Sequence, residues 1–256
     1  MTLNSTECEP VDRLDIIYHD DWLVAINKPA GLLVHRSMID RHETRFAMQV
    51  LRDQIGQHVY PLHRLDKPTS GVLLFALSAE TARKMGDALA ARETEKTYLA
   101  IVRGFTDEAG VIDYALKEEL DKKSDQKASR DKAAQEAVTE FRRVATVELP
   151  YPVGRYQSAR YSLVQLEPKT GRKHQLRRHM KHIFHPIVGD TTHGDGKQNQ
   201  FFRDFFSCNR MLLAAVKLEF RHPETSRSIV IRAPITDEFA RVVRDMGWDE
   251  ALAGLA

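Results

Sequence analysis

Short hydrophobic runs separated by turn residues recur along most of the chain, which is typical of strands. Residues 14–35 alternate such runs with turn signals at residues 19–21 and 28–31, so two or three short strands are expected there. The run Val72–Leu77 is hydrophobic at every position, as in a strand buried on both faces. Comparable patterns predict further strands at residues 59–66, 97–102, 138–149, 159–168, 211–220 and 228–234.

Helical spacing of hydrophobic residues is found in several other segments. These are residues 41–57, a helix capped by Ser78 and ending near Arg92, residues 172–184 with Leu176, Met180, Ile183 and Phe184 on one stripe, and residues 237–246. Because strands outnumber helices and mostly follow one another through short turns, the pattern predicts an α+β fold with a mixed, mostly antiparallel sheet and flanking helices. No linker rich in Pro, Gly or Ser divides the chain, so we interpret residues 1–256 as one domain.

The composition, with 42% hydrophobic and 29% charged residues among 256, is that of a globular protein. The longest hydrophobic runs are far shorter than the roughly 20 residues of a membrane span. The N-terminus has neither the basic stretch nor the apolar segment of a secretion signal. Cys8 and Cys208 are far apart in the sequence, which excludes a Cys-rich zinc site and a disulfide scaffold. We therefore expect a cytoplasmic protein that does not associate with membranes.

The charge distribution says more than the net charge of +2. Residues 169–182 hold six Lys or Arg and three His without a carboxylate, a local patch of the kind that binds phosphate backbones. Residues 117–136 instead carry six basic and six acidic side chains with little to bury. This second segment is interpreted as a solvated helix or a mobile insertion on the surface.

The segment HRLDKPTSG places a carboxylate and a cation next to a turn. If residues 63–66 are extended, His63 and Leu65 share one face, and Arg64 and Asp66 share the other, just before the Pro/Gly turn. Taken alone, such an Asp and Arg more often organise a turn than perform chemistry. The remaining motifs must decide between the two interpretations.

The basic segment combines a packing stripe with a row of cations at Lys173, Arg177 and Lys181, spaced by four residues. Because a solvated helix face normally mixes both signs of charge, we interpret this row as a phosphate-binding surface. A metal site on His174, His179, His182 and His185 is disfavoured, since the spacing lacks the usual ligand pattern and the intervening Arg and Lys repel a cation. A P-loop, a dinucleotide fingerprint and a G-x-S-x-G motif are absent from the sequence, which excludes the enzyme classes that depend on them.

Five motifs follow one another in a fixed order over nearly the whole chain. They are NKPxGLxVH (27–35), HRLDxxTSG (63–71), KxYxAxVxG (96–104), LxPxTGRxHQLRxH (166–179) and HPIVGD (185–190). Together they resemble the ordered motifs of the RluA family of pseudouridine synthases. The resemblance implies a pseudouridine synthase sheet with a central RNA-binding cleft, a charged insertion at about residues 105–137, and no N-terminal module of the S4 type.

The resemblance also implies an activity, the isomerisation of uridine to its C-glycoside in RNA. Asp66 is then the catalytic residue, acting either as nucleophile on the sugar or as the base that opens a glycal route. Arg177 is expected to pair with Asp66 and to keep it ionised. Tyr98 is expected to stack on the uracil, with Leu176 as an apolar wall. A single carboxylate suits this reaction, whereas glycosidases usually employ two.

A stacked uridine must leave the RNA helix before it can react. Arg64 resembles the family's side chain that occupies the vacated place, and the other expected substrate-binding residues are Arg172, Lys173, His174, Arg178 and Lys181. The expected partner is tRNA, without a cofactor, a metal or a protein partner, and the expected state is a monomer. The compact chain and its insertion resemble the members that modify uridine 65 of tRNA. The alternatives are ribosomal RNA or another tRNA position, a non-catalytic RNA-binding protein and, more distantly, a metal-dependent nuclease.

Overall fold

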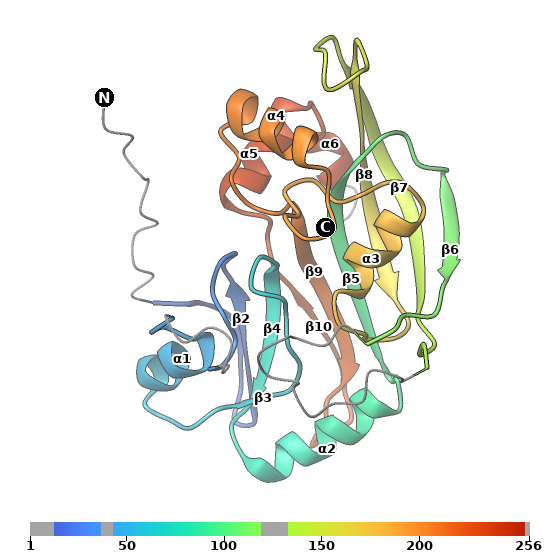
Figure 1. Cartoon of the computed structure of the whole chain (residues 1–256). Coiled ribbons are helices and arrows are strands. Elements are labelled where there is room, and N and C mark those ends of the chain that lie inside the picture. The colour runs from blue at the N-terminus through green and yellow to red at the C-terminus, as the bar shows by residue number, and fades with distance from the viewer. Residues whose placement is uncertain (1–12, 37–42, 119–132, 254–256) are drawn as a thin grey trace.

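The computed structural model describes residues 13–36, 43–118 and 133–253 of the chain. In this part of the chain ten strands form one sheet, in the order β1-β2-β4-β9-β5-β8-β7-β6, with β3 paired to β4 and β10 paired to β9 (Figure 1). Every pairing is antiparallel except the one between β4 and β9. The predicted α+β class with a mixed, mostly antiparallel sheet is confirmed.

The elements have the following bounds. The strands are β1 (Asp15–His19), β2 (Leu23–Lys28), β3 (Tyr60–Pro61), β4 (Ser70–Ala76), β5 (Thr94–Arg103), β6 (Ala109–Asp113), β7 (Val138–Leu149), β8 (Ala159–Pro168), β9 (Leu213–Arg221) and β10 (Ser228–Arg232). The helices are α1 (Ala47–Ile55), α2 (Ala79–Ala90), α3 (Gln175–His182), α4 (Gly196–Phe206), α5 (Asp237–Asp245) and α6 (Asp249–Ala253).

A short parallel contact between β4 and β9 joins the two halves of the sheet. It pairs Ser70 with Ala214 and Gly71 with Ala215. Gly71 has a φ of +110°, and a Cβ atom at this position would lie 2.1 Å from the carbonyl oxygen of Ala215. Glycine meets both conditions because it has no Cβ. The two halves therefore meet closely, directly beside the loop that carries Asp66.

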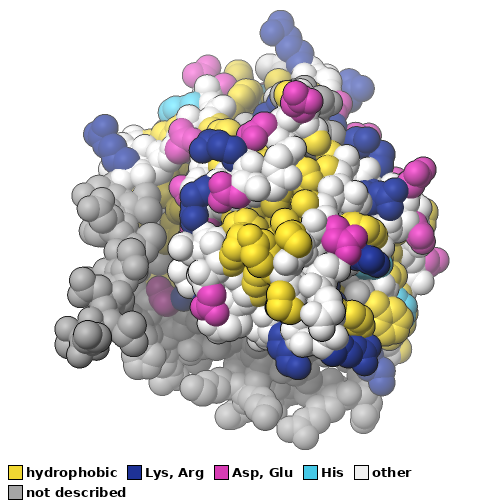
Figure 2. Space-filling model, turned by 90° about the horizontal axis from the view of Figure 1, so that it is seen from above, with side chains coloured by type: hydrophobic (Ala, Val, Ile, Leu, Met, Phe, Trp, Pro, Cys, Tyr) yellow, Lys and Arg dark blue, Asp and Glu magenta, His cyan; other side chains and the backbone are white. Residues whose placement is uncertain are grey.

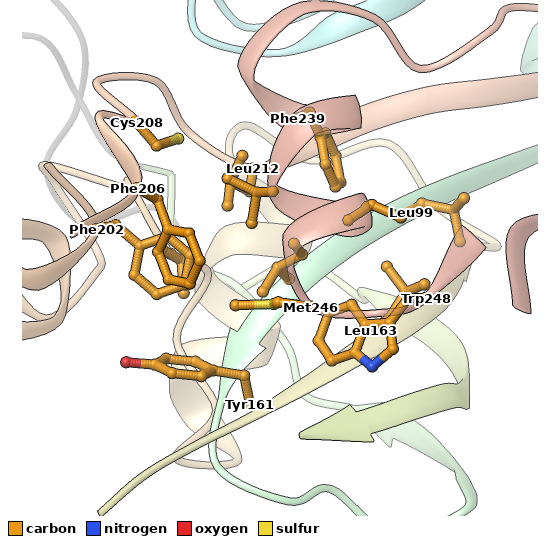
Figure 3. Packing of buried hydrophobic residues seen from close by; sticks show 14 of the residues in the cluster. Leu99, Tyr161, Leu163, Phe202, Phe206, Cys208, Leu212, Phe239, Met246 and Trp248 are labelled. Atoms are coloured by element: carbon orange, nitrogen blue, oxygen red, sulfur yellow. The ribbon is translucent and has the colours of Figure 1, made fainter. Parts of the chain in front are cut away.

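Strand β5 places alternate side chains on opposite faces of the sheet, as its two-residue period requires. Leu99 and Ile101 pack with aromatic residues of α4 and α5, and Figure 3 shows Leu99 in this cluster. Ala100 and Val102 pack on the other face, against Met180 of α3. Burial on both faces thus fixes β5 in the middle of the sheet and fixes α3 over one side of it.

The strand predicted at residues 59–66 is much shorter in the structure, where only Tyr60–Pro61 pairs with β4. The ladder ends because the backbone N–H of Leu74 donates to the ring of His63 instead of to a backbone carbonyl. The predicted alternation nevertheless persists in the loop, with Leu65 buried and Arg64 exposed.

The helix predicted at residues 172–184 is also shorter, since α3 spans Gln175–His182. His174 and Phe184 adopt left-handed backbone conformations, with φ of 54° and 66°, and so lie outside the helix at its two ends. The prediction that Phe184 belongs to the packing stripe is wrong, because its side chain is 85% exposed. Lys173 likewise precedes the helix, so it does not share a helical face with Lys181.

Three further elements were not predicted from the sequence: α4, β6 and the short helix α6 near the end of the described residues. Helix α4 carries aromatic residues at a spacing of four, and the Asp195 side chain caps it by accepting from the N–H groups of Lys197 and Gln198. Strand β6 lies in the segment interpreted as a charged insertion and pairs with β7 at the edge of the sheet. Much of the solvated helix or mobile insertion expected at 117–136 lies outside the described residues.

Candidate active site

Asp66 lies on the loop between β3 and β4, where the two halves of the sheet meet. Two backbone hydrogen bonds hold this loop: Gly31 N–H donates to the Lys67 carbonyl over 2.8 Å, and Thr69 N–H donates to the Asp66 carbonyl over 3.0 Å. The Asp66 side chain is 22% exposed. Its carboxylate is thus fixed by a turn and still open to a ligand.

The buried Lys28 at the end of β2 ties the same loop down. Its ammonium group donates to two carbonyl oxygens of the turn after β2 over 2.8 Å each, and to the Lys67 carbonyl over 3.2 Å. Burial and the nearby Arg210 lower the pKa of Lys28 to about 7, against the opposing influence of the Asp66 charge. Lys28 is therefore an internal strut between β2 and the loop that carries Asp66.

Arg177 on α3 links Asp66 to a second carboxylate. Its Nη1 donates to Asp66 Oδ2 over 3.1 Å, while Nε and Nη2 donate to Oδ2 and Oδ1 of Asp190 over 2.7 and 2.8 Å. Burial opposes both charges, but the hydrogen bonds between Arg177 and Asp190 outweigh it, so the pKa of Asp190 is lowered and that of Arg177 is raised. Arg177 thus links two carboxylates, one 111 residues and one 13 residues away in the sequence.

A cavity of about 700 Å³ opens beside Asp66. Tyr98 of β5, Leu176 of α3 and Leu213 of β9 form hydrophobic parts of its wall. Burial, together with the Asp66 charge, raises the pKa of the Tyr98 hydroxyl, so the ring stays neutral at physiological pH. An aromatic ring with aliphatic neighbours is suited to hold a planar base.

The structure brings together all the predicted site residues except Lys181. The lining of the cavity includes Arg64, Asp66, Tyr98, Arg172, Lys173, His174, Leu176, Arg177 and Arg178. A second cavity of about 550 Å³ adjoins the first, and Arg64, Asp66 and Arg177 line both. Arg64 is exposed at their boundary, whereas Lys181 is exposed near the C-terminal end of α3 and lines neither cavity.

Two of the predicted RNA-binding arginines also hold the wall of the cavity. Arg172 Nε donates to the Glu136 carbonyl over 3.0 Å, and Arg178 Nη1 donates to the Lys117 carbonyl over 2.9 Å. These carbonyls belong to two segments that are themselves bridged between residues 116 and 135. The ends of the expected insertion therefore form part of the site.

The histidines of the basic segment diverge in the structure. His174 Nε2 lies 3.9 Å from Asp66 Oδ2, and its Nδ1 lies 3.0 Å from His193 Nε2. His179 is buried against Thr139 and the Tyr114 carbonyl. Within the described residues, no group of three or more His, Cys, Asp or Glu side chains is arranged to hold a metal ion.

None of the described helices is long and apolar enough to cross a membrane.

Three side chains around Asp66 received no role from the sequence: Lys28, Asp190 and His193. Lys28 belongs to the motif at 27–35 and Asp190 to the motif at 185–190, and a feature of the neighbouring sequence could have indicated each of them. Lys28 ends a strand that is hydrophobic at most positions, and Asp190 follows a glycine close to a basic segment whose sequence contains no carboxylate. His193 had no comparable signal, because its partner His174 is reached only through the fold.

The electrostatics of the cavity differ from those of the upper face of the molecule. Seven Lys or Arg side chains line the cavity against two carboxylates, those of Asp66 and Glu118. Figure 2 shows the face at the top of Figure 1, where both signs of charge surround a group of hydrophobic side chains. A polyanion is therefore attracted to the cavity more strongly than to this face.

Comparison with known proteins gives this site its class. The model of the RNA pseudouridylate synthase family matches residues 22–182, a segment that contains Asp66, Tyr98 and Arg177. The chain belongs to the RNA pseudouridylate synthase family. The family resemblance inferred from the five motifs is confirmed.

Individual relatives match most of the chain. It is 58% identical over 239 residues to tRNA pseudouridine synthase C of Vibrio cholerae, covering 93% of this chain and 98% of that protein. The protein of the same name in Haemophilus influenzae is 53% identical over 236 residues, covering 92% and 99%.

Solved structures of two human proteins also match. RNA pseudouridylate synthase domain containing 1 gives a TM-score of 0.68 at 25% identity, over 90% of this chain and 86% of that chain. RNA pseudouridylate synthase domain containing 4 gives 0.68 at 25% identity, over 91% and 93%.

Proposed function

We propose that the protein isomerises uridine to pseudouridine in tRNA, at uridine 65. The observation that carries the proposal is the Asp66 carboxylate, bound by Arg177 and open to a basic cavity walled by Tyr98. The likeness to tRNA pseudouridine synthase C of two bacteria supports tRNA as the substrate. The motif resemblance supports position 65.

The proposed reaction exchanges one glycosidic bond for another within a single nucleotide. The N1–C1′ bond breaks, the detached uracil turns, C5 bonds to C1′, and C5 then loses its proton while N1, which gave up the sugar, takes up a proton. Asp66 opens the first bond either by attacking C1′, which gives an ester that C5 later displaces, or by removing the proton of C2′ to give a glycal, a proton that returns to C2′ when C5 bonds to C1′. Because the uracil itself is the next nucleophile, no second carboxylate is needed to activate water.

The neighbours of Asp66 have separate tasks in this scheme. Arg177 orients the carboxylate through the hydrogen bond from its Nη1. Tyr98 stacks on the uracil and Leu176 closes the apolar side of the cavity, so the detached base stays beside C1′ and water is kept away. Retention of the base decides whether isomerisation or hydrolysis follows.

A uridine in a stem reaches the cavity only by base flipping, at a cost of a few kcal/mol. Arg64 is exposed at the boundary of the two cavities and lies two residues before Asp66, so it is placed to enter the position that the uridine leaves. Arg172, Lys173 and Arg178 line the cavity and supply positive charge that attracts the RNA backbone, and His174 lines the cavity beside them.

The test is release of tritium from a tRNA transcript that carries uridine labelled at C5, with and without EDTA. The proposed enzyme is a monomer that needs no metal and modifies one position. One tritium per tRNA is therefore expected both with and without EDTA. A matched transcript with a C–G pair at position 65 should release none. Undiminished release from that transcript would place the reaction at another position. Binding without release would indicate a non-catalytic RNA-binding protein, and strand breaks abolished by EDTA would indicate a nuclease.

A further inference from the structure

We infer that three exposed rings at the C-terminal end of α3, those of Phe184, His182 and Tyr114, form a second RNA contact that stacks on an unpaired base of the bound tRNA. This stacking surface is separate from the candidate active site, because none of its side chains lines either of the two cavities beside Asp66. The inference deepens the proposed function and rests on it for the identity of the RNA.

Phe184 is displayed to solvent by an unfavourable backbone conformation. Its side chain is 85% exposed, more than any other large hydrophobic side chain in the described part of the chain. Its φ of 66° is left-handed, a conformation that glycine adopts readily at a helix end and that is rare for a bulky residue. Neither burial nor backbone conformation therefore explains a phenylalanine at this position. Such strain is commonly retained where the side chain has a function.

The turn that carries Phe184 is anchored to the sheet. The backbone N–H groups of Phe184 and His185 donate to carbonyls of the last turn of α3 over 3.0 and 2.9 Å. The Nδ1 atom of His185 lies 2.8 Å from the carbonyl oxygen of Arg103 on β5. Ile183 packs against the hydrophobic cluster beneath α3. The residues on both sides of Phe184 thus hold its backbone in place before any RNA arrives.

A stacked pair of rings lies at the same end of α3. The ring centroids of Tyr114 and His182 are 3.6 Å apart, and the planes of the rings differ by 16°. Tyr114 is 45% exposed, and His182 is exposed as well. The Tyr114 carbonyl oxygen lies 3.1 Å from Nε2 of the buried His179, so the backbone of Tyr114 is tied to the helix. Exposed rings on a fixed support provide what stacking on a base requires.

The charge next to these rings favours a polyanion. Residues 169–189 contain no carboxylate, and the exposed Lys181 lies three residues before Phe184. Arg178 lines the larger cavity, so positive charge extends along α3 from that cavity to the stacking surface, over roughly 12 Å at about 1.5 Å per residue. Asp113, next to Tyr114 in the sequence, carries the opposite charge at the edge of this region. Cations combined with exposed rings are typical of contacts with unpaired nucleotides.

The expected ligand of the stacking surface is a base in the loop that closes the stem of uridine 65. Bases within a stem already stack on one another, whereas those of a loop are open to aromatic side chains. With the target uridine in the cavity, α3 leads away from the cavity towards the stacking surface. One tRNA arm would then be held at two points, its stem at the cavity and its loop at Phe184.

The test compares tRNA binding by Phe184→Ala and Phe205→Ala in the full chain, measured by filter retention. Phe205 is a matched control because it is 47% exposed but belongs to α4, which packs on the opposite face of the sheet from α3. Phe184→Ala is expected to raise the Kd about 10-fold, the scale of one stacked base, and Phe205→Ala less than twofold. Phe184→Trp should bind like the parent and Phe184→Leu like Phe184→Ala, because stacking requires a ring. The single-turnover rate at saturating tRNA should be the same in all four variants.

A glycine variant separates stacking from a structural role. Phe184→Gly should raise the Tm, since glycine adopts the left-handed conformation without strain, and should nevertheless weaken tRNA binding as much as Phe184→Ala does. Loss of binding together with a lowered Tm in Phe184→Gly would show that Phe184 only supports the fold.

The isolated target stem, closed by a flexible non-nucleotide linker in place of the loop, tests which base is bound. The parent and Phe184→Ala should bind this stem equally. A parent that binds tRNA but releases no tritium overturns the proposed function alone, because the comparison of Kd values still reports on the stacking surface. Equal tRNA binding by the parent and Phe184→Ala overturns the stacking surface alone. A loss in Phe184→Ala that is the same with the isolated stem, or full binding by Phe184→Leu, also contradicts stacking on a loop base.

Discussion

The segment 169–182 carries two kinds of cation, and they differ in burial. Arg177 is 5% exposed, with its guanidinium bound by two carboxylates. Lys181, one helical turn further on, is exposed to water. Both cations belong to one segment without a carboxylate. Arg177 nevertheless binds two carboxylates at the candidate active site, whereas Lys181 adds to the positive potential of the surface. A buried cation needs a fixed partner, whereas an exposed one is solvated by water.

The largest effect is expected from Asp66, the carboxylate that the buried Arg177 binds. Asp66→Asn should lower the single-turnover rate by more than about 1,000-fold, because the amide has nearly the same shape but can neither attack the sugar nor remove a proton. Binding of tRNA, measured by filter retention, should stay within about threefold, since neutral amides still hydrogen-bond. Pseudouridine formation by Asp66→Asn near the parent rate would remove Asp66 from the chemistry.

A second buried cation allows a stability test. Lys28→Met should lower the free energy of unfolding by about 2 to 4 kcal/mol, because carbonyl acceptors of the turn and of the Lys67 loop lose their donor. Urea unfolding measures this decrease. The control is Lys181→Met at an exposed site, where a change within about 0.5 kcal/mol is expected. Equal effects of the two substitutions would contradict the distinction between buried and exposed cations.

The lowered pKa of Lys28 also predicts how the free energy of unfolding depends on pH. Its pKa is about 7 in the folded protein, whereas the ordinary value for a lysine is 10.5. Between these values the Lys28 side chain is protonated in the unfolded chain but not in the folded protein. The free energy of unfolding therefore rises as pH rises from 7, and this gain is lost again as pH falls towards 7. The parent should therefore gain about 2 kcal/mol more than Lys28→Met between pH 7 and pH 9. Parallel pH profiles of the two proteins would show that Lys28 stays protonated throughout.

Arg64 is intermediate between the buried Arg177 and the exposed Lys181, since its side chain is exposed but lines the same cavity as Asp66. If it fills the place of the flipped uridine, Arg64→Ala must lose more activity on a paired uridine than on a mismatched one, which has less stacking to give up. The expected difference is about 1 to 3 kcal/mol in the ratio of catalytic efficiencies, the scale of one base stack. Arg177→Lys is the control and should slow both substrates alike. An equal loss for Arg64→Ala on both substrates would leave Arg64 as a phosphate-binding or turn-organising residue.

The smallest effect is expected from the lysines Lys173 and Lys181. Replacing both with Gln should weaken tRNA binding and lower the slope of its salt dependence by about one for each phosphate that is no longer neutralised. The rate at saturating tRNA should hardly change, because neither ammonium group takes part in the proposed chemistry. Titrations at several salt concentrations measure the slope. A slope unchanged from that of the parent would show that these lysines are merely solvated.

Much of the sheet was predictable from local pattern. The strands expected at 138–149 and 159–168 have the bounds of β7 and β8: β7 alternates hydrophobic and polar residues with the period of a half-buried strand, and β8 is a short, largely buried segment bounded by turns. The cap of α2 at Ser78 was also predictable, because the hydroxyl and the N–H of Thr81 that it binds are three residues apart. Such features depend only on near neighbours in the chain.

The sequence by itself determined the fold class and the strands with clear periodicity, and its motifs indicated Asp66 as the candidate catalytic residue. Only the tertiary structure decided that residues 63–66 form a loop, and that Arg177 is buried between Asp66 and Asp190. It also decided that Lys173 lies outside α3. The physical reason is the range of the interactions: periodicity and capping act over a few residues, whereas the hydrogen bond between Arg177 and Asp66 spans 111 residues. Burial and hydrogen bonding at such a distance exist only once the two halves of the sheet have met.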